Sequence, residues 1–165
     1  MRRSFTHLEE YIYAMYTKIG IYHPHQLDIE DIASRLGMQV FYMPHKPMYI
    51  NGVFFLDNRT TATKQWQSFC HELCHALLHA GDQLNMPPPF RDYQEWQADS
   101  FALHACVPTS MLIDIGLPSD EKRAVWMVQE TFGVEYDFAA KRLDKWKKKI
   151  EGQSFQSHFM KELAR

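Results

Sequence analysis

The segment at residues 71–75, HELCH, constrains the fold more strongly than any other part of the chain. It falls in the second half of residues 61–80, where apolar side chains recur at the spacing of an amphipathic helix. On such a helix, His71 and His75 project from the same face, one turn apart. Two imidazoles in this arrangement can bind one Zn²⁺ at about 2.0–2.1 Å, and a third ligand must then come from elsewhere in the chain.

Glu72 lies beside the first histidine of this pair and is rotated by about 100° around the helix axis. At that angle its carboxylate misses the metal and faces a water molecule bound to it. This is the position that a general base requires. The pattern H-E-x-x-H therefore predicts a zinc site with its own base, whereas an ordinary helix with two exposed histidines is the alternative.

The third protein ligand is expected from the next helix, at about residues 91–106. Glu95 and Asp99 are the best candidates there, and they are again one helical turn apart. A stiff proline-rich connector, NMPPPF at 85–90, separates the two helices, which could then pack as an antiparallel pair. In that arrangement Glu95 would lie under the metal, and Asp99 would accept the second ring N–H of His71.

The remaining patterns predict one α+β domain covering residues 1–165, with a small antiparallel sheet packed on a mainly helical body. The expected order is a helix at 4–19, a helix plus short strands at 28–60, the zinc helices at 61–106 and further helices at 109–150. Thr6 with Glu9 resembles a capping box, and Asp120 and Gly133 mark helix boundaries. The polar tail at 152–165 is expected to be partly frayed.

Composition excludes several classes of protein. The formal net charge of −2 provides no bulk attraction for nucleic acid. Three cysteines without regular spacing argue against a disulfide framework, and no stretch reads as a signal peptide or a membrane span. We therefore expect a cytoplasmic protein with no membrane association and no direct contact with nucleic acid.

The segments "SFCHELCHALLHAGD" and "EWQADSFALHACVP" resemble the ImmA/IrrE family of zinc metallopeptidases. The similarity extends to "LDIEDIASRLGMQVFYM", "INGVFFLDNRTTATKQWQ" and "VQETFGVEYDFAAKRLDKW", and it covers roughly residues 25–147. The stretch "HELCHALLHAG" is most similar to the ImmA members carried by mobile elements. The end of the second segment, HACVP, departs from the more aliphatic sequence of many members and affects packing only.

The resemblance implies roles for particular residues. His71, His75 and Glu95 would be the zinc ligands, Glu72 the catalytic base, and Asp99 an outer partner of a ligand. It also implies that the protein is an endopeptidase that cleaves a helix-turn-helix repressor encoded nearby. Such an anti-repressor would release the genes of a phage or an integrative element. The expected mechanism is attack by a zinc-bound water molecule, assisted by the glutamate.

Other residues leave alternatives open. An oxyanion or substrate role is open for four residues near the motifs, namely His79, Arg91, Tyr93 and His104. His79 lies about 12 Å along the helix from His71, so one metal cannot easily bind all three histidines. The strand GVFFLD, at 52–57, either forms a sheet edge that pairs with an extended peptide or places Phe54 and Phe55 in the core and its rim.

Two further functions compete with the protease hypothesis. A zinc-containing regulator could inactivate a repressor by binding alone, although such a protein would have no need of Glu72. A DNA-binding module is suggested by residues 28–42, where a short helix resembles the start of a helix-turn-helix. The segment that follows reads as a strand and not as a recognition helix, which argues against this function.

Overall fold

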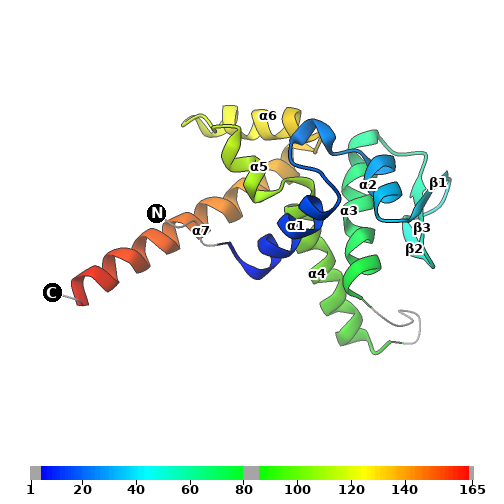
Figure 1. Ribbon diagram of the computed structural model, residues 1–165, viewed down its shortest axis with the longest axis horizontal. Helices are drawn as coiled ribbons and strands as arrows, with labels where there is room; N and C mark the ends of the chain where they lie inside the picture. The colour runs from blue at the N-terminus through cyan, green and yellow to red at the C-terminus, as the bar shows by residue number, and fades with distance from the viewer. Residues whose placement is uncertain (1–4, 80–85, 164–165) are drawn as a thin grey trace.

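The computed structural model describes residues 5–79 and 86–163 and shows a helical body with a small sheet at one side (Figure 1). Side chains are described as far as residue 156. In chain order the elements are α1 (His7–Lys18), the 3₁₀ helix η1 (Pro24–Gln26), α2 (Ile29–Arg35), β1 (Gln39–Met43), β2 (Met48–Ile50), β3 (Val53–Asp57), α3 (Ala62–Leu78), α4 (Pro88–Cys106), α5 (Thr109–Asp114), α6 (Glu121–Phe132) and α7 (Tyr136–Leu163). The prediction of an α+β fold is confirmed.

Local capping signals set several helix ends where the sequence predicts them. The Thr6 hydroxyl and the Glu9 carboxylate form the reciprocal capping box at the start of α1. Asp120 caps α6, and Gly133 ends that helix in the left-handed conformation with φ 62°. Residue 4 of the helix predicted at 4–19 lies outside the described residues, and α1 begins at His7.

The sheet is mixed, so the prediction of an antiparallel sheet is wrong for one of its two strand pairs. Its order is β1-β3-β2, with β3 antiparallel to β2 but parallel to β1. Asn51 and Gly52 both have positive φ, 47° and 87°, as a tight hairpin turn between β2 and β3 requires. The segment at 44–47 carries the chain from β1 to the other side of β3, and this crossover makes β1 and β3 parallel.

β3 occupies the centre of the sheet, so the alternative in which GVFFLD forms a sheet edge is wrong. Phe54 and Leu56 are fully buried, and the Phe54 ring packs against Phe69 of α3 with centroids 4.8 Å apart. Phe55 lies half-buried on the other face, stacked on Phe41. The most apolar strand is therefore central because both its apolar face and its two hydrogen-bonding edges are covered. The alternative that placed these phenylalanines in the core and its rim is confirmed.

Helices α3 and α4 lie side by side and run in opposite directions (Figure 1). The predicted start of the second helix, near residue 91, is wrong by one turn, because α4 begins at Pro88. Prolines at the first positions of a helix cost no hydrogen bond, because the N–H groups of those positions have no partner within the helix. Part of the proline-rich connector, Asn85, lies outside the described residues.

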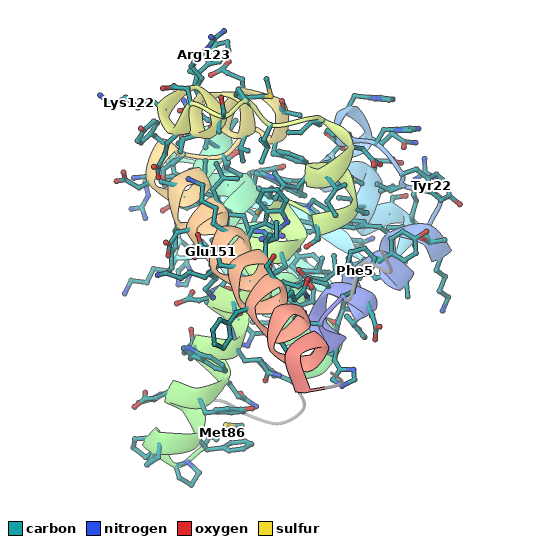
Figure 2. All side chains as sticks on the ribbon, turned by 90° about the vertical axis from the view of Figure 1, so that its left-hand side faces the viewer. Phe5, Tyr22, Met86, Lys122, Arg123 and Glu151 are labelled. Carbon is teal, nitrogen blue, oxygen red and sulfur yellow. The ribbon has the colours of Figure 1, made fainter. Side chains whose placement is uncertain are left out.

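The second half of helix α7 extends away from the body toward the C-terminus (Figure 1), and the start of α4 near Met86 also extends beyond the body (Figure 2). The expectation of a frayed tail after Gly152 is wrong, because α7 continues to Leu163. A glycine within a helix costs only about 1 kcal/mol relative to alanine, and the neighbouring residues are good helix formers. Within residues 5–79 and 86–163, no helix combines the length and apolar composition needed to cross a membrane.

A buried polar cluster joins the two ends of the chain to α5, and we call it the Glu9 cluster (Glu9, Thr109, Arg142 and Lys149). Glu9 is 5% exposed and accepts hydrogen bonds from Thr109 Oγ1 at 2.7 Å and from Lys149 Nζ. The fully buried Arg142 donates to Thr109 Oγ1 at 2.7 Å and to the Val107 carbonyl at 3.1 Å. Burial alone would raise the pKa of Glu9, but hydrogen bonds from Lys149, Thr6 and Thr109 bring it to about 2.

Candidate metal centre

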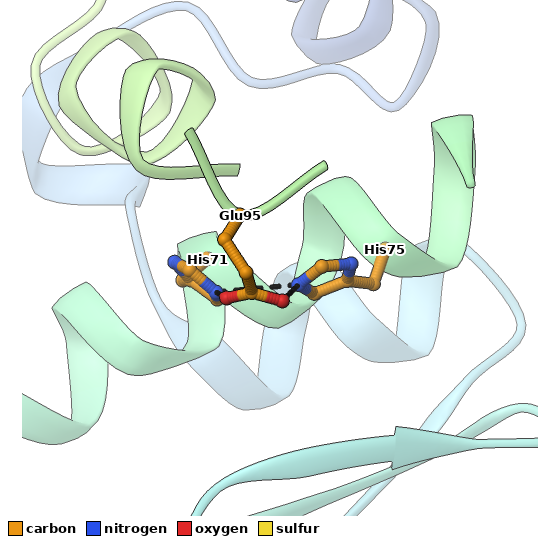
Figure 3. Close-up of side chains that lie close together, drawn as sticks. All are labelled: His71, His75 and Glu95. Carbon is orange, nitrogen blue, oxygen red and sulfur yellow. Dashed lines mark hydrogen bonds and ion pairs between the residues drawn. The ribbon is translucent and has the colours of Figure 1, made fainter. Parts of the chain in front are cut away.

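Three side chains from α3 and α4 converge on one point, and we call them the His–Glu cluster (His71, His75 and Glu95; Figure 3). The Nε2 atoms of His71 and His75 are 3.2 Å apart. Glu95 places Oε2 at 3.1 Å from the first of these nitrogens and Oε1 at 3.4 Å from the second. Donor atoms bound tetrahedrally to zinc at about 2.0–2.1 Å are separated by about 3.3 Å. The separations within the donor set are therefore close to those of a tetrahedral zinc site, with each carboxylate oxygen facing one imidazole.

Helix geometry explains why these atoms meet. His71 and His75 are one turn apart on α3, so both imidazoles leave the same face of the helix. Glu95 reaches them from α4, on the opposite side of the interface between the two helices (Figure 3). Cys74 and Ala98 lie next to the ligand positions of their two helices and are fully buried, so the helices are closely packed there.

The second ring nitrogen of His71 is also occupied. His71 Nδ1 donates to Asp99 Oδ1 at 3.0 Å, and Asp99 lies one turn beyond Glu95 on α4. A ring nitrogen that donates in this way leaves the other nitrogen, Nε2, with its lone pair directed at the cluster. The structure thus brings together all four of the residues that the sequence predicts at or beside the metal.

His75 is the more deeply placed of the two imidazoles, with 9% of its side chain exposed compared with 22% for His71. Burial lowers the pKa of His75 to about 4, although the Glu95 carboxylate acts in the opposite direction. The ring is therefore neutral at physiological pH, which is the state in which an imidazole can coordinate a metal.

Glu72 lies at the edge of the cluster and lines a cleft of about 480 Å³ together with His71 and Asp99. Burial raises its pKa, and the charge of Glu95 adds to that effect, whereas His71 and a backbone hydrogen bond from Tyr49 oppose it. A carboxylate whose pKa lies nearer to neutrality can both accept and release a proton, as a general base must.

The cleft is formed by four parts of the chain. The segment between β1 and β2 contributes Lys46 and Pro47, and α7 contributes Phe138 and Lys141. Helices α3 and α4 form the remaining walls. The lining of the cleft therefore combines polar residues of the candidate metal centre with the apolar Phe138 and with two lysines, Lys46 and Lys141. Sequence patterns do not indicate these lining residues, because they come from segments far apart in the chain.

The four residues proposed for substrate or oxyanion contacts do not line this cleft. Tyr93 is 54% exposed and packs against Trp96, and Arg91 is also exposed. His104 donates from Nδ1 to the Ser100 carbonyl at 2.9 Å within its own helix. His79 contacts His75 instead, at 2.8 Å between the two Nδ1 atoms. Their roles in binding a substrate stay predictions.

One contact of this centre was not anticipated from the sequence. Gln97 lies 2.9 Å from the second nitrogen of His79, so a chain of polar contacts runs from the cluster through two histidines to an amide. The signal for its first part was present, because His71, His75 and His79 recur at four-residue spacing. Gln97 itself is two residues from Glu95, and no helical spacing connects it with the histidines.

Comparison with known proteins identifies the family of the chain. Residues 24–144 match the family model Peptidase M78, described as the IrrE N-terminal-like domain. Two proteins of Bacillus subtilis (strain 168) are similar along most of the chain. The phage-like element PBSX protein XkdA is 38% identical over 92% of this chain and 78% of its own length. The protein YqaB is 37% identical over 94% of this chain and 92% of its own.

A solved structure shares the fold. A Mycobacterium tuberculosis transcriptional regulator superposes with a TM-score of 0.54 at 16% identity, over 80% of this chain. The chain spans 44% of the length of that regulator, so this likeness concerns one part of a larger protein. The family model covers most of the chain, and both Bacillus proteins exceed one third identity over nearly all of it. The chain therefore belongs to the ImmA/IrrE family, the M78 family of metallopeptidases.

Proposed function

We propose that this protein is a zinc-dependent endopeptidase that cleaves a helix-turn-helix transcriptional repressor and so acts as an anti-repressor of a mobile element. The observation that carries the proposal is the convergence of the His–Glu cluster at separations that suit tetrahedral zinc, with Glu72 in the adjoining cleft. Similarity to a protein of a phage-like element supports the mobile-element context. The proposed metal ligands are His71, His75 and Glu95.

Each residue of the centre then has a separate task. When bound, zinc lowers the pKa of a water molecule toward 7 and polarises the scissile carbonyl. Glu72 accepts the proton of the attacking water and delivers it to the leaving amine. Asp99 keeps the proton of His71 on Nδ1, and so orients that ring. The neutral state of His75, held by its burial, leaves its Nε2 available to the metal.

The edge of the sheet supplies a path for the substrate. β2 is an edge strand, and the backbone N–H of its Tyr49 is near enough to Glu72 to lower the pKa of that carboxyl group. A peptide that adds to this edge in an extended conformation would pass directly beside the proposed base. The strand-addition hypothesis made for GVFFLD therefore moves from β3, which is paired on both sides, to β2.

The decisive experiment is incubation with the repressor encoded beside this gene, with zinc present or removed by a chelator, followed by mass spectrometry of the products. We expect two complementary fragments that appear only when zinc is present. The variant Glu72→Gln should bind zinc normally but cleave about 10²–10⁴-fold more slowly, the range associated with a general base. The matched control is Glu151→Gln, an exposed position on α7.

The same variant separates cleavage from inactivation by binding alone. If Glu72→Gln relieves repression in cells as well as the parent protein does, the protease function is wrong and the regulator acts by binding. If the parent protein and Glu72→Gln both bind the repressor but neither cleaves it, the protease function is also wrong. Fragments produced by the parent and lost in the variant support the proposal.

A further inference from the structure

His79 joins the proposed metal centre to α4 through two polar contacts. The residue immediately follows α3, where its backbone leaves the helical conformation with φ −110° and ψ 124°. This bend turns the imidazole back toward the preceding turn, so that its Nδ1 lies 2.8 Å from His75 Nδ1. Its other nitrogen, Nε2, lies 2.9 Å from Gln97 Oε1. The side chain is half-buried between the two helices.

The donors and acceptors in the contacts from Gln97 through His79 to His75 determine which ring nitrogens carry protons. The amide oxygen of Gln97 only accepts, so His79 must carry its proton on Nε2. In a neutral imidazole the other nitrogen is then an acceptor, and His79 Nδ1 must receive a proton from His75 Nδ1. His75 therefore carries its own proton on Nδ1, which leaves the lone pair of Nε2 directed at the His–Glu cluster.

The reverse direction is incompatible with a metal. If the amide nitrogen of Gln97 faced His79, it would donate to Nε2, and His79 would then donate from Nδ1. His75 would have to accept at Nδ1 and keep its proton on Nε2, the atom that faces the cluster. Only the orientation in which the Gln97 oxygen faces His79 prepares His75 to coordinate.

We propose that His79 and Gln97 are positioning residues that hold His75 in the tautomer and orientation required for metal binding. The inference rests on the proposed metal centre and adds two residues to it. The two ligand imidazoles are then held by different means. Asp99 holds His71 directly with a carboxylate, whereas His75 is held by a neutral relay of an imidazole and an amide.

The test measures zinc affinity by competition with a chromogenic chelator, using the full chain. His79→Ala should weaken zinc binding by about 10–100-fold, the effect typical of losing an outer partner of a ligand. The matched control is His25→Ala, which removes an exposed histidine on η1, far along the chain from the cluster. Comparable affinities for the parent protein and His79→Ala would overturn the inference.

Two substitutions at Gln97 separate positioning from a merely structural role. Gln97→Glu keeps an oxygen acceptor for His79 and should retain zinc affinity, whereas Gln97→Leu removes the acceptor and should weaken it. Ring-nitrogen NMR of the zinc-loaded parent should show His75 protonated on Nδ1 and His79 on Nε2, and Gln97→Leu should change the His79 signal. A His79 ring protonated on Nδ1 in the parent would overturn the inference.

The affinity of the parent protein distinguishes this inference from the proposed function. A parent that binds no zinc at all contradicts the metal centre itself. If the parent protein binds zinc tightly and His79→Ala and Gln97→Leu bind it equally tightly, the relay is contradicted. The proposed metal centre is then still supported.

Discussion

The protein contains two polar clusters that differ in whether their polar groups satisfy one another by hydrogen bonds. The Glu9 cluster is closed, because its carboxylate and its guanidinium are buried and each has protein partners. The His–Glu cluster is open, because Glu95 is 45% exposed and the Nε2 lone pairs of His71 and His75 face the Glu95 carboxylate with no proton between them. A cluster that satisfies its own hydrogen bonds stabilises the fold, whereas one whose lone pairs converge is arranged for a cation.

The largest expected effect concerns the open cluster. Glu95→Ala removes one of three ligands, and zinc affinity should fall by more than about 100-fold, beyond the range seen for outer partners. The stability of the zinc-free protein should change by no more than about 1 kcal/mol, because the side chain is nearly half exposed. Chelator competition and urea unfolding measure the two quantities. If Glu95→Ala kept the zinc affinity of the parent protein, the His–Glu cluster would not be the metal site that distinguishes it from the Glu9 cluster.

The closed cluster should show the opposite pattern. Glu9→Ala leaves Lys149 and Thr109 without their shared acceptor, and we expect a loss of about 3 kcal/mol in the free energy of unfolding. Zinc affinity should be unchanged, because this cluster joins α1, α5 and α7 and contributes no residue to the cleft. The control is Glu10→Ala, the exposed neighbour on the same helix. A stable Glu9→Ala protein with weakened zinc binding would contradict this assignment.

The stability of the protein at acid pH should depend on the Glu9 carboxylate. The pKa of Glu9 is about 2 in the folded protein and 4.5 ordinarily, so the unfolded chain binds a proton that the folded protein does not. The stabilisation is therefore present above pH 4.5 and is lost as the pH falls toward 2. Its full size is about 3 kcal/mol. We expect the parent to lose stability more steeply than Glu9→Gln in denaturant titrations across this range, and parallel curves would contradict the role of Glu9.

The smallest effect is expected for an exposed ion pair on the helix that also supplies Lys149 to the closed cluster. Lys148 Nζ lies 2.7 Å from Asp144 Oδ2, with 71% and 57% of the two side chains exposed. Lys148→Ala should change the free energy of unfolding by less than about 0.5 kcal/mol, because water and salt screen such pairs. A loss as large as that of Glu9→Ala would show that burial is not what separates the two kinds of ion pair.

Much of the candidate metal centre could be predicted from sequence, because its geometry is local to each helix. The one-turn spacing of His71 and His75, and of Glu95 and Asp99, places each pair on a single face in any α-helix. If the two helices pack as an antiparallel pair, these faces meet at one point, and the structure shows that arrangement. The location of these side chains in the structure agrees with that reasoning, and their catalytic and binding roles stay predictions.

The topology of the sheet is harder to predict from sequence, because strand pairing joins residues that sequence patterns do not connect. Alternation of apolar residues identifies Val53–Asp57 as a strand, but not whether its neighbours run parallel or antiparallel to it. The route of the chain across β3 decides that, and it also decides that β2 and not β3 forms the edge beside Glu72. For the same reason, no sequence spacing indicated that Gln97 meets His79 or that Arg142 meets Thr109.

By itself the sequence determined which side chains share a helix face, and it determined the helix ends that carry a capping residue, such as Thr6, Asp120 and Gly133. Hydrogen bonds between near neighbours and the 3.6-residue turn impose these features without reference to the rest of the chain. The tertiary structure alone decided which faces meet. Packing of α3 against α4 set the separations of the zinc-ligand candidates, and the crossover at 44–47 placed β1 and β2 on opposite edges of the sheet. Contacts of α1 with α5 and α7 surrounded Glu9 with its hydrogen-bond partners. These outcomes depend on contacts between distant segments, which form only when the whole core is assembled.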